Sequence, residues 1–290
     1  MKRIAAIVGV LVGLTAGSAQ ASFIINLSFS GFTPTEESYF TAAKTFWEGK
    51  ITGYQGSSTL SGLSILVTSA DLGDGGIAAE AGPTDGVDAG GFLYATEGVI
   101  NVNKREIDDL IKYGAFTSVI QHEMAHVIGF GSLWADNGVY IDGTGKFTGA
   151  YALSAYRNEF NQPTATFVPV DLCGVDGTAD GHWAEVCGGF GLTGIVDRQG
   201  RDLAYERMPG GYQGSDFVSR TTIASFQDIG YTVAQDVPAP ATITLLGLGL
   251  VGIGACRRKG GERGQALAGW SGYRSLSHAS MSSMPISPAT

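Results

Sequence analysis

The chain has 290 residues, of which 44% are hydrophobic and 16% charged, and its formal net charge is −9. The acidic excess is concentrated in residues 22–236, which carry 11 Lys and Arg against 26 Asp and Glu, a net charge of −15. This balance argues against nucleic acid and anionic lipid surfaces as partners, because both attract positive charge. The region is also long enough for one domain with a sizeable core.

The N-terminus has the three parts of a secretory signal peptide. Lys2-Arg3 is a short positive region, residues 4–14 are apolar, and Ser18-Ala-Gln-Ala21 supplies the small residues of a cleavage site. The pattern predicts a signal peptide over residues 1–21, and therefore an exported protein. The alternative, a permanent N-terminal anchor, is disfavoured because the apolar run is too short to span a bilayer.

The exported region begins with short strands and a helix. Residues 38–47 have the pattern of an amphipathic helix, and runs rich in β-branched and aromatic residues predict strands at 23–29, 64–68 and 98–103. A short closing helix is predicted over residues 221–229.

Residues 71–91 are rich in Gly, Asp and Pro and are predicted to form a loop. The aspartates of this loop could bind Ca²⁺, but neither EF-hand nor nonapeptide spacing is present. A plain loop is therefore favoured over a calcium site.

The most informative stretch is Gln-His-Glu-Met-Ala-His-Val-Ile-Gly-Phe-Gly, residues 121–131. On a helix, His122 and His126 lie on one face, so both imidazoles can reach one metal ion, with Glu123 beside them. This set is typical of a zinc peptidase centre, in which a glutamate takes a proton from a zinc-activated water. The alternative, a solvated helix face with two surface histidines, is disfavoured because the surrounding residues are largely apolar.

A catalytic zinc ion needs three protein ligands and one open position. The chain has four histidines, and His278 lies in a low-complexity segment, so His182 is the natural third ligand. The alternative is an ordinary loop histidine beside an aromatic residue.

These residues resemble the leishmanolysin-type metzincins, in particular their secreted bacterial members. The resemblance covers roughly residues 38–233, and its most specific part is Gly181-His-Trp-Ala-Glu185, placed after a long insertion behind the zinc motif. It implies that His122, His126 and His182 bind one catalytic Zn²⁺ and that Glu123 is the general base. The other matching segments are Ala42–Glu48, Phe147–Ala152, Val168–Asp171 and Thr222–Tyr231.

The resemblance also implies an α+β fold of the metzincin type. A small, twisted mixed sheet and helices would lie above the cleft, and an irregular C-terminal subdomain would lie below it. Gly129 can end the motif helix with a positive φ and turn the chain back toward the metal. Compact metzincins have a third histidine three residues later, where this chain has Ser132, so the third ligand must come from far downstream.

Metzincins also have a methionine in a tight turn under the zinc ion, which in relatives of this type lies in a Glu-Leu-Met-Thr-Gly segment. Here the region is Arg201–Gly211, and Met208 before Pro209-Gly210 is the candidate. Residues 187–197 also depart from the family pattern. Either the rim of the site differs from that of its relatives, or this copy has decayed.

Cys173 and Cys187 flank His182 in an exported domain and could form a disulfide around this loop. Such a bond would restrict the unfolded chain and steady His182. Two free thiols, or zinc ligation by one of them, are the alternatives. Cys256 lies in a separate apolar segment and cannot easily reach the others.

That segment, residues 237–259, combines Pro-Ala-Pro, a Gly- and Leu-rich apolar stretch and the basic cluster Arg257–Lys259. It resembles a PEP-CTERM sorting signal. As a helix, residues 241–256 would span about 24 Å, a little short of the ~30 Å hydrocarbon core. A simple C-terminal anchor is the alternative, and the low-complexity tail at 260–290 is predicted to be disordered.

The sorting resemblance implies transient membrane association through this segment and recognition by the sorting and processing machinery of the envelope. A periplasm-facing inner-membrane intermediate would then be released to the cell surface, to the extracellular matrix or into the medium. The zinc motif favours a secreted or cell-surface endopeptidase that acts on proteins or peptides, with its domain at residues 22–236. The alternative is a non-catalytic surface or matrix adhesion protein that retains the peptidase fold.

Overall fold

The computed structural model describes residues 22–234, except for 57–58, 61, 75, 174–177, 188–190, 212 and 215–216. The predicted signal peptide, sorting segment and tail lie outside the described residues. Among the helices that the structure describes, none has both the length and the apolar character that a membrane span needs.

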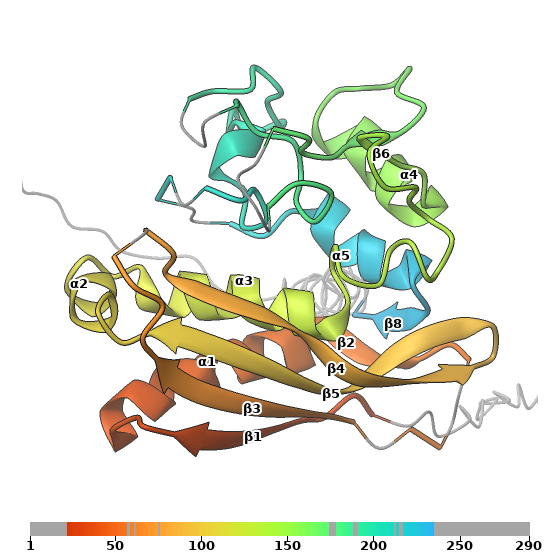
Figure 1. The fold of residues 1–290 in the computed structure, drawn as a ribbon. Helices are drawn as coiled ribbons and strands as arrows, with labels where there is room; N and C mark the ends of the chain where they lie inside the picture. Colours follow the sequence, from red (N-terminus) through yellow and green to blue (C-terminus); the bar gives the residue numbers. More distant parts are fainter. Residues whose placement is uncertain are drawn as a thin grey trace, which may run out of the picture. The chain divides into compact units, whose positions relative to one another are not determined.

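A four-stranded mixed sheet forms the floor of the N-terminal half (Figure 1). Its strand order is β1 (Ile25–Ser30), β3 (Leu63–Ala70), β5 (Phe92–Asn103) and β4 (Ala79–Ala89). The first three strands are parallel to one another, and β4 pairs antiparallel with β5 at the edge. Together with the helices this is an α+β fold, and the three predicted strands are confirmed, although β5 begins six residues earlier than the predicted 98–103.

Strand β4 corrects the expectation of a loop over residues 71–91. Residues 79–89 pair with β5 through a two-residue turn in which Gly90 and Gly91 have φ of 60° and 89°. Such a turn matches the twist of a hairpin and needs glycine, so Gly90-Gly91 was a hairpin signal that the composition of the loop obscured. Pro83 is tolerated because it lies at an edge strand, beside an irregularity in the register.

The alternative of a calcium site in this loop, which the sequence already disfavoured, is not supported by the ion pairs of its first two aspartates. Asp71 and Asp74 form ion pairs with the guanidinium of Arg105, each with an N–O distance of 2.6 Å. Lys104 also lies 3.3 Å from Asp71. These hydrogen bonds hold the pKa of Asp71 well below its usual range, so cationic side chains of the protein already neutralise these carboxylates.

The motif helix α3 (Phe116–Ile128) follows the short helix α2 (Ile107–Lys112) and lies between the sheet and the C-terminal half (Figure 1). Helix α1 (Pro34–Lys50) packs against it; α1 starts with a capping box and has the fully buried Trp47 in its last turn. The indole Nε1 of Trp47 donates to the carbonyl of Gln121, at 2.9 Å. Helix α1 therefore supports α3 directly in front of its first histidine.

The C-terminal half is mostly irregular, as expected, but it contains a helix pair. It has the two-residue strands β6 (Lys146–Phe147) and β7 (Val168–Pro169) and the 3-10 helix η1 (Leu203–Tyr205). Helices α4 (Ala150–Glu159) and α5 (Arg220–Asp228) pack together. Strand β8 (Tyr231–Val233) then pairs antiparallel with β2 (Ile51–Tyr54), which attaches the end of the domain to its first half.

Helices α4 and α5 cap each other. The Asp228 carboxylate, at the end of α5, accepts the amides of Tyr151 and Ala152 at the start of α4, both at 2.8 Å. The Glu159 carboxylate, at the end of α4, accepts the amides of Arg220 and Thr221 at 3.1 and 3.0 Å. These bonds satisfy first-turn N–H groups that have no partner within their own helix.

An aromatic cluster forms the core of this half. Phe130, Trp134, Phe147 and Trp183 are all fully buried. Trp183 lies 5.0 Å from the ring centroids of Phe130 and Trp134 and 5.4 Å from that of Phe147. Its indole Nε1 donates to Thr222 Oγ1 on α5, at 2.8 Å. The residue directly after His182 is thereby anchored in the core.

Replacing Glu159 with alanine removes the acceptor of two first-turn amides of α5, while Ser219 remains as the N-cap of that helix. We expect the free energy of unfolding, measured by urea denaturation, to fall by about 0.5–2 kcal/mol. Asp136→Ala, at an exposed carboxylate outside both helices, serves as the control and should change stability by less than about 0.5 kcal/mol. Equal losses in the two variants would contradict a capping role.

Candidate metal centre

Three imidazoles converge at the C-terminal end of α3. His122 and His126 come from successive turns of this helix, and His182 comes from a loop 56 positions beyond His126. The three Nε2 atoms lie 2.9, 3.0 and 3.0 Å from one another. Among the described residues, these three histidines are the one cluster of three or more His, Cys, Asp or Glu side chains whose ligand atoms lie close enough together to hold a metal ion.

Backbone carbonyls determine which nitrogen of each ring faces the centre. His122 Nδ1 lies 2.8 Å from the carbonyl of Arg207, His126 Nδ1 2.9 Å from that of Phe130, and His182 Nδ1 2.7 Å from that of Thr178. A carbonyl only accepts, so each Nδ1 carries the proton and each Nε2 presents a lone pair. Metal-binding histidines use this arrangement.

The geometry fits a small tetrahedral cation. Zn–N bonds of about 2.0–2.1 Å at tetrahedral angles place ligand nitrogens about 3.3 Å apart. The separations of 2.9–3.0 Å are slightly shorter, and a small outward shift of the rings would match them. Three nitrogen donors on one side leave the fourth position open.

The surroundings keep the imidazoles neutral. His126 and His182 are 9% and 5% exposed, and His122 is partly buried. Burial, followed by the neighbouring imidazole, lowers the pKa of each of the three to about 3. At neutral pH all three are therefore unprotonated and available as ligands.

Glu123 lies beside the triad on α3 and is 7% exposed. Burial raises the pKa of its carboxyl group to about 8, with a smaller contribution from the negative charge of Glu80 on β4. A divalent cation held by the histidines would lower this pKa, because it stabilises the carboxylate. The group is then suited to exchange protons near neutral pH.

Close contact between Gly131 and Gly181 brings the third histidine to the end of helix α3. Gly129 ends this helix with a φ of 132°, and Gly131 follows with a φ of 74°. A Cβ atom on Gly131 would lie 2.3 Å from the carbonyl oxygen of Gly181, so only glycine allows this approach. Ser132, in the position of the third histidine of compact metzincins, donates its hydroxyl to the carbonyl of His126.

Met208 is fully buried in a segment that contacts two of the histidine-bearing stretches. Its carbonyl accepts the amide of Trp183 at 3.1 Å, and the preceding carbonyl, of Arg207, accepts from His122. Its own amide donates to Glu206 Oε2 at 2.6 Å. The Met-turn candidate is therefore located next to the triad.

Glu206 is a positioning residue that the sequence analysis missed. It is 1% exposed, and besides Met208 its carboxylate accepts the amide of Ser219 and the hydroxyl of Thr222, both at 2.7 Å. A glutamate two residues before a methionine, as in the Glu-Leu-Met-Thr-Gly segment of the proteins that the chain resembles, was the available signal. It ties the Met208 segment to the start of α5.

Cys173 and Cys187 form a disulfide with an S–S distance of 2.10 Å, so this prediction is confirmed in the structure. The bond closes a loop that contains His182. Neither cysteine is then available as a zinc ligand. The cross-link restricts the unfolded chain and limits how far the third ligand can move.

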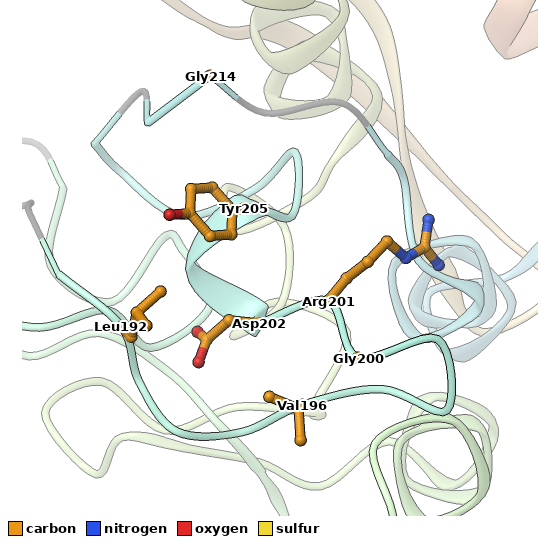
Figure 2. Close-up of a pocket in the computed structure, with 7 residues that line it drawn as sticks. All are labelled: Leu192, Val196, Gly200, Arg201, Asp202, Tyr205 and Gly214. Atoms are coloured by element: carbon orange, nitrogen blue, oxygen red, sulfur yellow. The ribbon is translucent and has the colours of Figure 1, made fainter. Parts of the chain in front are cut away.

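A separate cavity of about 520 Å³ lies in the C-terminal half (Figure 2). Leu192, Val196 and Tyr205 lie around it, while the side chain of Arg201 extends away from them. The Arg201 guanidinium stacks on Phe217, 3.8 Å from its ring centroid. None of the triad residues lines this cavity, so it is not part of the metal centre.

Comparison with known proteins identifies the C-terminal segment. Residues 236–259 match the family model of the PEP-CTERM protein-sorting motif. This motif indicates export, sorting within the envelope and interaction with the exosortase-type sorting machinery. No curated protein matches the chain.

We expect the exported protein to bind one divalent transition-metal ion per chain. Replacing His122, His126 or His182 with alanine should lower metal affinity by more than about 100-fold, since even the loss of an outer partner costs 10- to 100-fold. Metal content after dialysis, measured by mass spectrometry, tests this. His278→Ala, made like the other variants in the full-length chain, is the matched control and should retain the metal; equal binding by all four variants would contradict the site.

The metal-free protein should lose stability as the pH falls from about 6.5 toward about 3. The histidine pKa values are lower in the folded state, so the unfolded state takes up protons first and is favoured by acid. Glu123 has the opposite sign, and its contribution is lost as the pH rises through about 8. Thermal melts of the metal-free protein from about pH 3 to about pH 9 test both effects, and the triple histidine-to-glutamine variant should show a shallower loss between about pH 6.5 and about pH 5.

Proposed function

We propose that this chain is an exported zinc-dependent endopeptidase of the leishmanolysin-like metzincin type. The observation that carries the proposal is the convergence of three neutral Nε2 atoms beside the buried carboxyl group of Glu123. Three nitrogen ligands with a free fourth position are typical of catalytic rather than structural zinc. Zinc is favoured among the transition metals because it accepts a tetrahedral set of imidazoles.

The arrangement of the fold also supports a metzincin. The mixed sheet and helix α1 lie on one side of α3, and the irregular half lies on the other (Figure 1). The third ligand and the Met208 segment both come from that second half. This is the division into an upper and a lower subdomain that the family resemblance implies.

A bound zinc ion would polarise the scissile carbonyl and acidify a water molecule. Glu123 would accept the proton of the attacking water on a carboxylate oxygen and return it to the leaving amine. The backbone carbonyls of Arg207, Phe130 and Thr178 hold the three imidazoles in place throughout, so the ligands need no rearrangement during the reaction.

The exposed edge of the four-stranded sheet, formed by β4, is consistent with protein or peptide substrates. Strand β4 has one strand neighbour among the described residues, so its outer edge offers backbone hydrogen-bonding groups to an extended peptide. Strand β4 packs against helix α3, which carries the proposed catalytic base Glu123. After sorting, the enzyme would act at the cell surface, in the matrix or in the medium.

Replacing Glu123 with alanine should abolish hydrolysis while leaving the metal bound. Casein cleavage by residues 22–236, loaded with zinc, should fall by at least about 10²–10⁴-fold, the usual contribution of a general base. Glu97→Gln, at an exposed carboxylate on β5, is the control and should retain activity. Zinc binding without cleavage by the wild type would instead favour the non-catalytic adhesion protein.

A further inference from the structure

Asp180, two residues before the third histidine, has an unusual backbone conformation. Its φ is 65°, and among the described residues Asn161 is the one other non-glycine residue with a positive φ. Aspartate adopts this left-handed region more often than most residues, but glycine adopts it with less strain. A residue that keeps such a conformation is held in it by its surroundings, often at a functional site.

The Asp180 side chain is held by residues 140–143. Its Oδ1 accepts the hydroxyl of Tyr140 at 2.5 Å and the amide of Gly143 at 2.8 Å. The Asp180 amide donates to the carbonyl of Asp171, at 2.9 Å. The side chain and the backbone of this one residue therefore connect two other segments of the chain to the turn that carries it.

Tyr140 is itself firmly held. It is 4% exposed, and its ring centroid lies 5.9 Å from that of Trp134 in the aromatic cluster. Its hydroxyl accepts the amide of Gly145 at 3.1 Å and uses its own proton toward Asp180. Burial, followed by the hydrogen bond to Asp180, raises the pKa of Tyr140 to about 12, so the hydroxyl stays protonated at neutral pH. The Asp180 carboxylate is thus tied to the aromatic core of this half.

Asp180 lies in the middle of the turn that orients the third imidazole. His182 Nδ1 lies 2.7 Å from the carbonyl of Thr178, so the two residues must face each other across Asp180. The carbonyl of His182 accepts the amide of Asp171 at 2.9 Å, and Asp180 donates its amide to the carbonyl of that same residue. The conformation of Asp180 therefore determines the direction in which the His182 ring leaves the chain.

We propose that Asp180 is a positioning residue for the metal centre. Its carboxylate, held by Tyr140 and Gly143, keeps the turn closed and the third imidazole directed at the other two, with the Nε2 atoms 3.0 Å apart. It is not itself a ligand, because the cluster of ligand atoms found among the described residues comprises the three histidines alone. This role rests on the proposed function, since it concerns the metal ion that the peptidase would use. Residues that orient metal ligands from behind contribute to metal affinity without touching the ion.

Cobalt binding to the full exported chain tests this role. Co²⁺ takes the same nitrogen ligands as Zn²⁺, and its visible absorption reports how many ligands bind and in what geometry. We expect Asp180→Ala to lower the affinity for Co²⁺ by about 10–100-fold, as for other residues that orient metal ligands, and to change the visible spectrum. Asp180→Asn keeps an acceptor oxygen and tolerates a positive φ, so it should bind within about 3-fold of the wild type.

Two further variants separate the side chain from the backbone. Asp180→Gly removes the strain of the positive φ together with the side chain, and should also lose at least about 10-fold in affinity. Tyr140→Phe removes one of the two donors and should cause a smaller loss; it serves if Asp180→Ala does not fold. Asp142→Ala, at an exposed carboxylate in the same loop, is the matched control and should leave affinity and spectrum unchanged.

Four results would overturn the positioning role while leaving the metal centre intact. Wild-type affinity and spectrum in Asp180→Ala, with only a lower Tm, would show that the carboxylate stabilises the loop alone. Wild-type affinity in Asp180→Gly would assign the effect to the backbone, and a loss in Asp180→Asn as large as in Asp180→Ala would assign it to the negative charge. Wild-type binding by Tyr140→Phe would show that the hydroxyl does not hold the carboxylate. No Co²⁺ binding by the wild type would instead contradict both this role and the proposed function.

Discussion

Three imidazole nitrogens held about 3 Å apart, all presenting lone pairs, repel one another, so the rest of the fold must hold them together until a cation lies between them. The Nδ1 atom of each ring is hydrogen-bonded to a backbone carbonyl, and these three carbonyls belong to three separate segments of the chain. Misplacing any one of these segments would turn a ring away from the centre. The metal centre therefore depends on the tertiary structure more than on the motif helix.

The second half of the domain meets this demand with little regular structure. Its order comes instead from the buried aromatic rings around Trp183, the mutual caps of α4 and α5, and the carboxylate of Glu206. Side chains here satisfy backbone amides that ladders would satisfy in a sheet.

The disulfide and the acidic charge of the domain are both consistent with an exported protein. A disulfide persists in an oxidising compartment, and the acidic surface that accompanies the sorting motif favours solubility there. The disulfide lies on the same stretch of chain as His182. The least regular ligand segment thus receives the cross-link.

Much of the site followed from the sequence because its signals are local. The spacing of His122 and His126 depends only on the helical repeat, and the small number of histidines left His182 as the third member of the triad. Core strands such as β3 were recognisable because burial on one face imposes alternation along the chain. The signal and sorting segments were recognisable because they are defined by order and composition.

Other features depended on contacts between distant residues. Strand β4 forms because β5 offers it an edge, although its Gly- and Asp-rich sequence has weak strand propensity. Glu206 looks like an ordinary acidic residue until the chain folds, and only its burial and its hydrogen bonds show that it connects the Met208 segment to the start of α5. The sequence by itself determined the chemistry of the ligands. The tertiary structure decided their convergence, because close approaches such as that of Gly131 to Gly181 are not encoded in any local pattern.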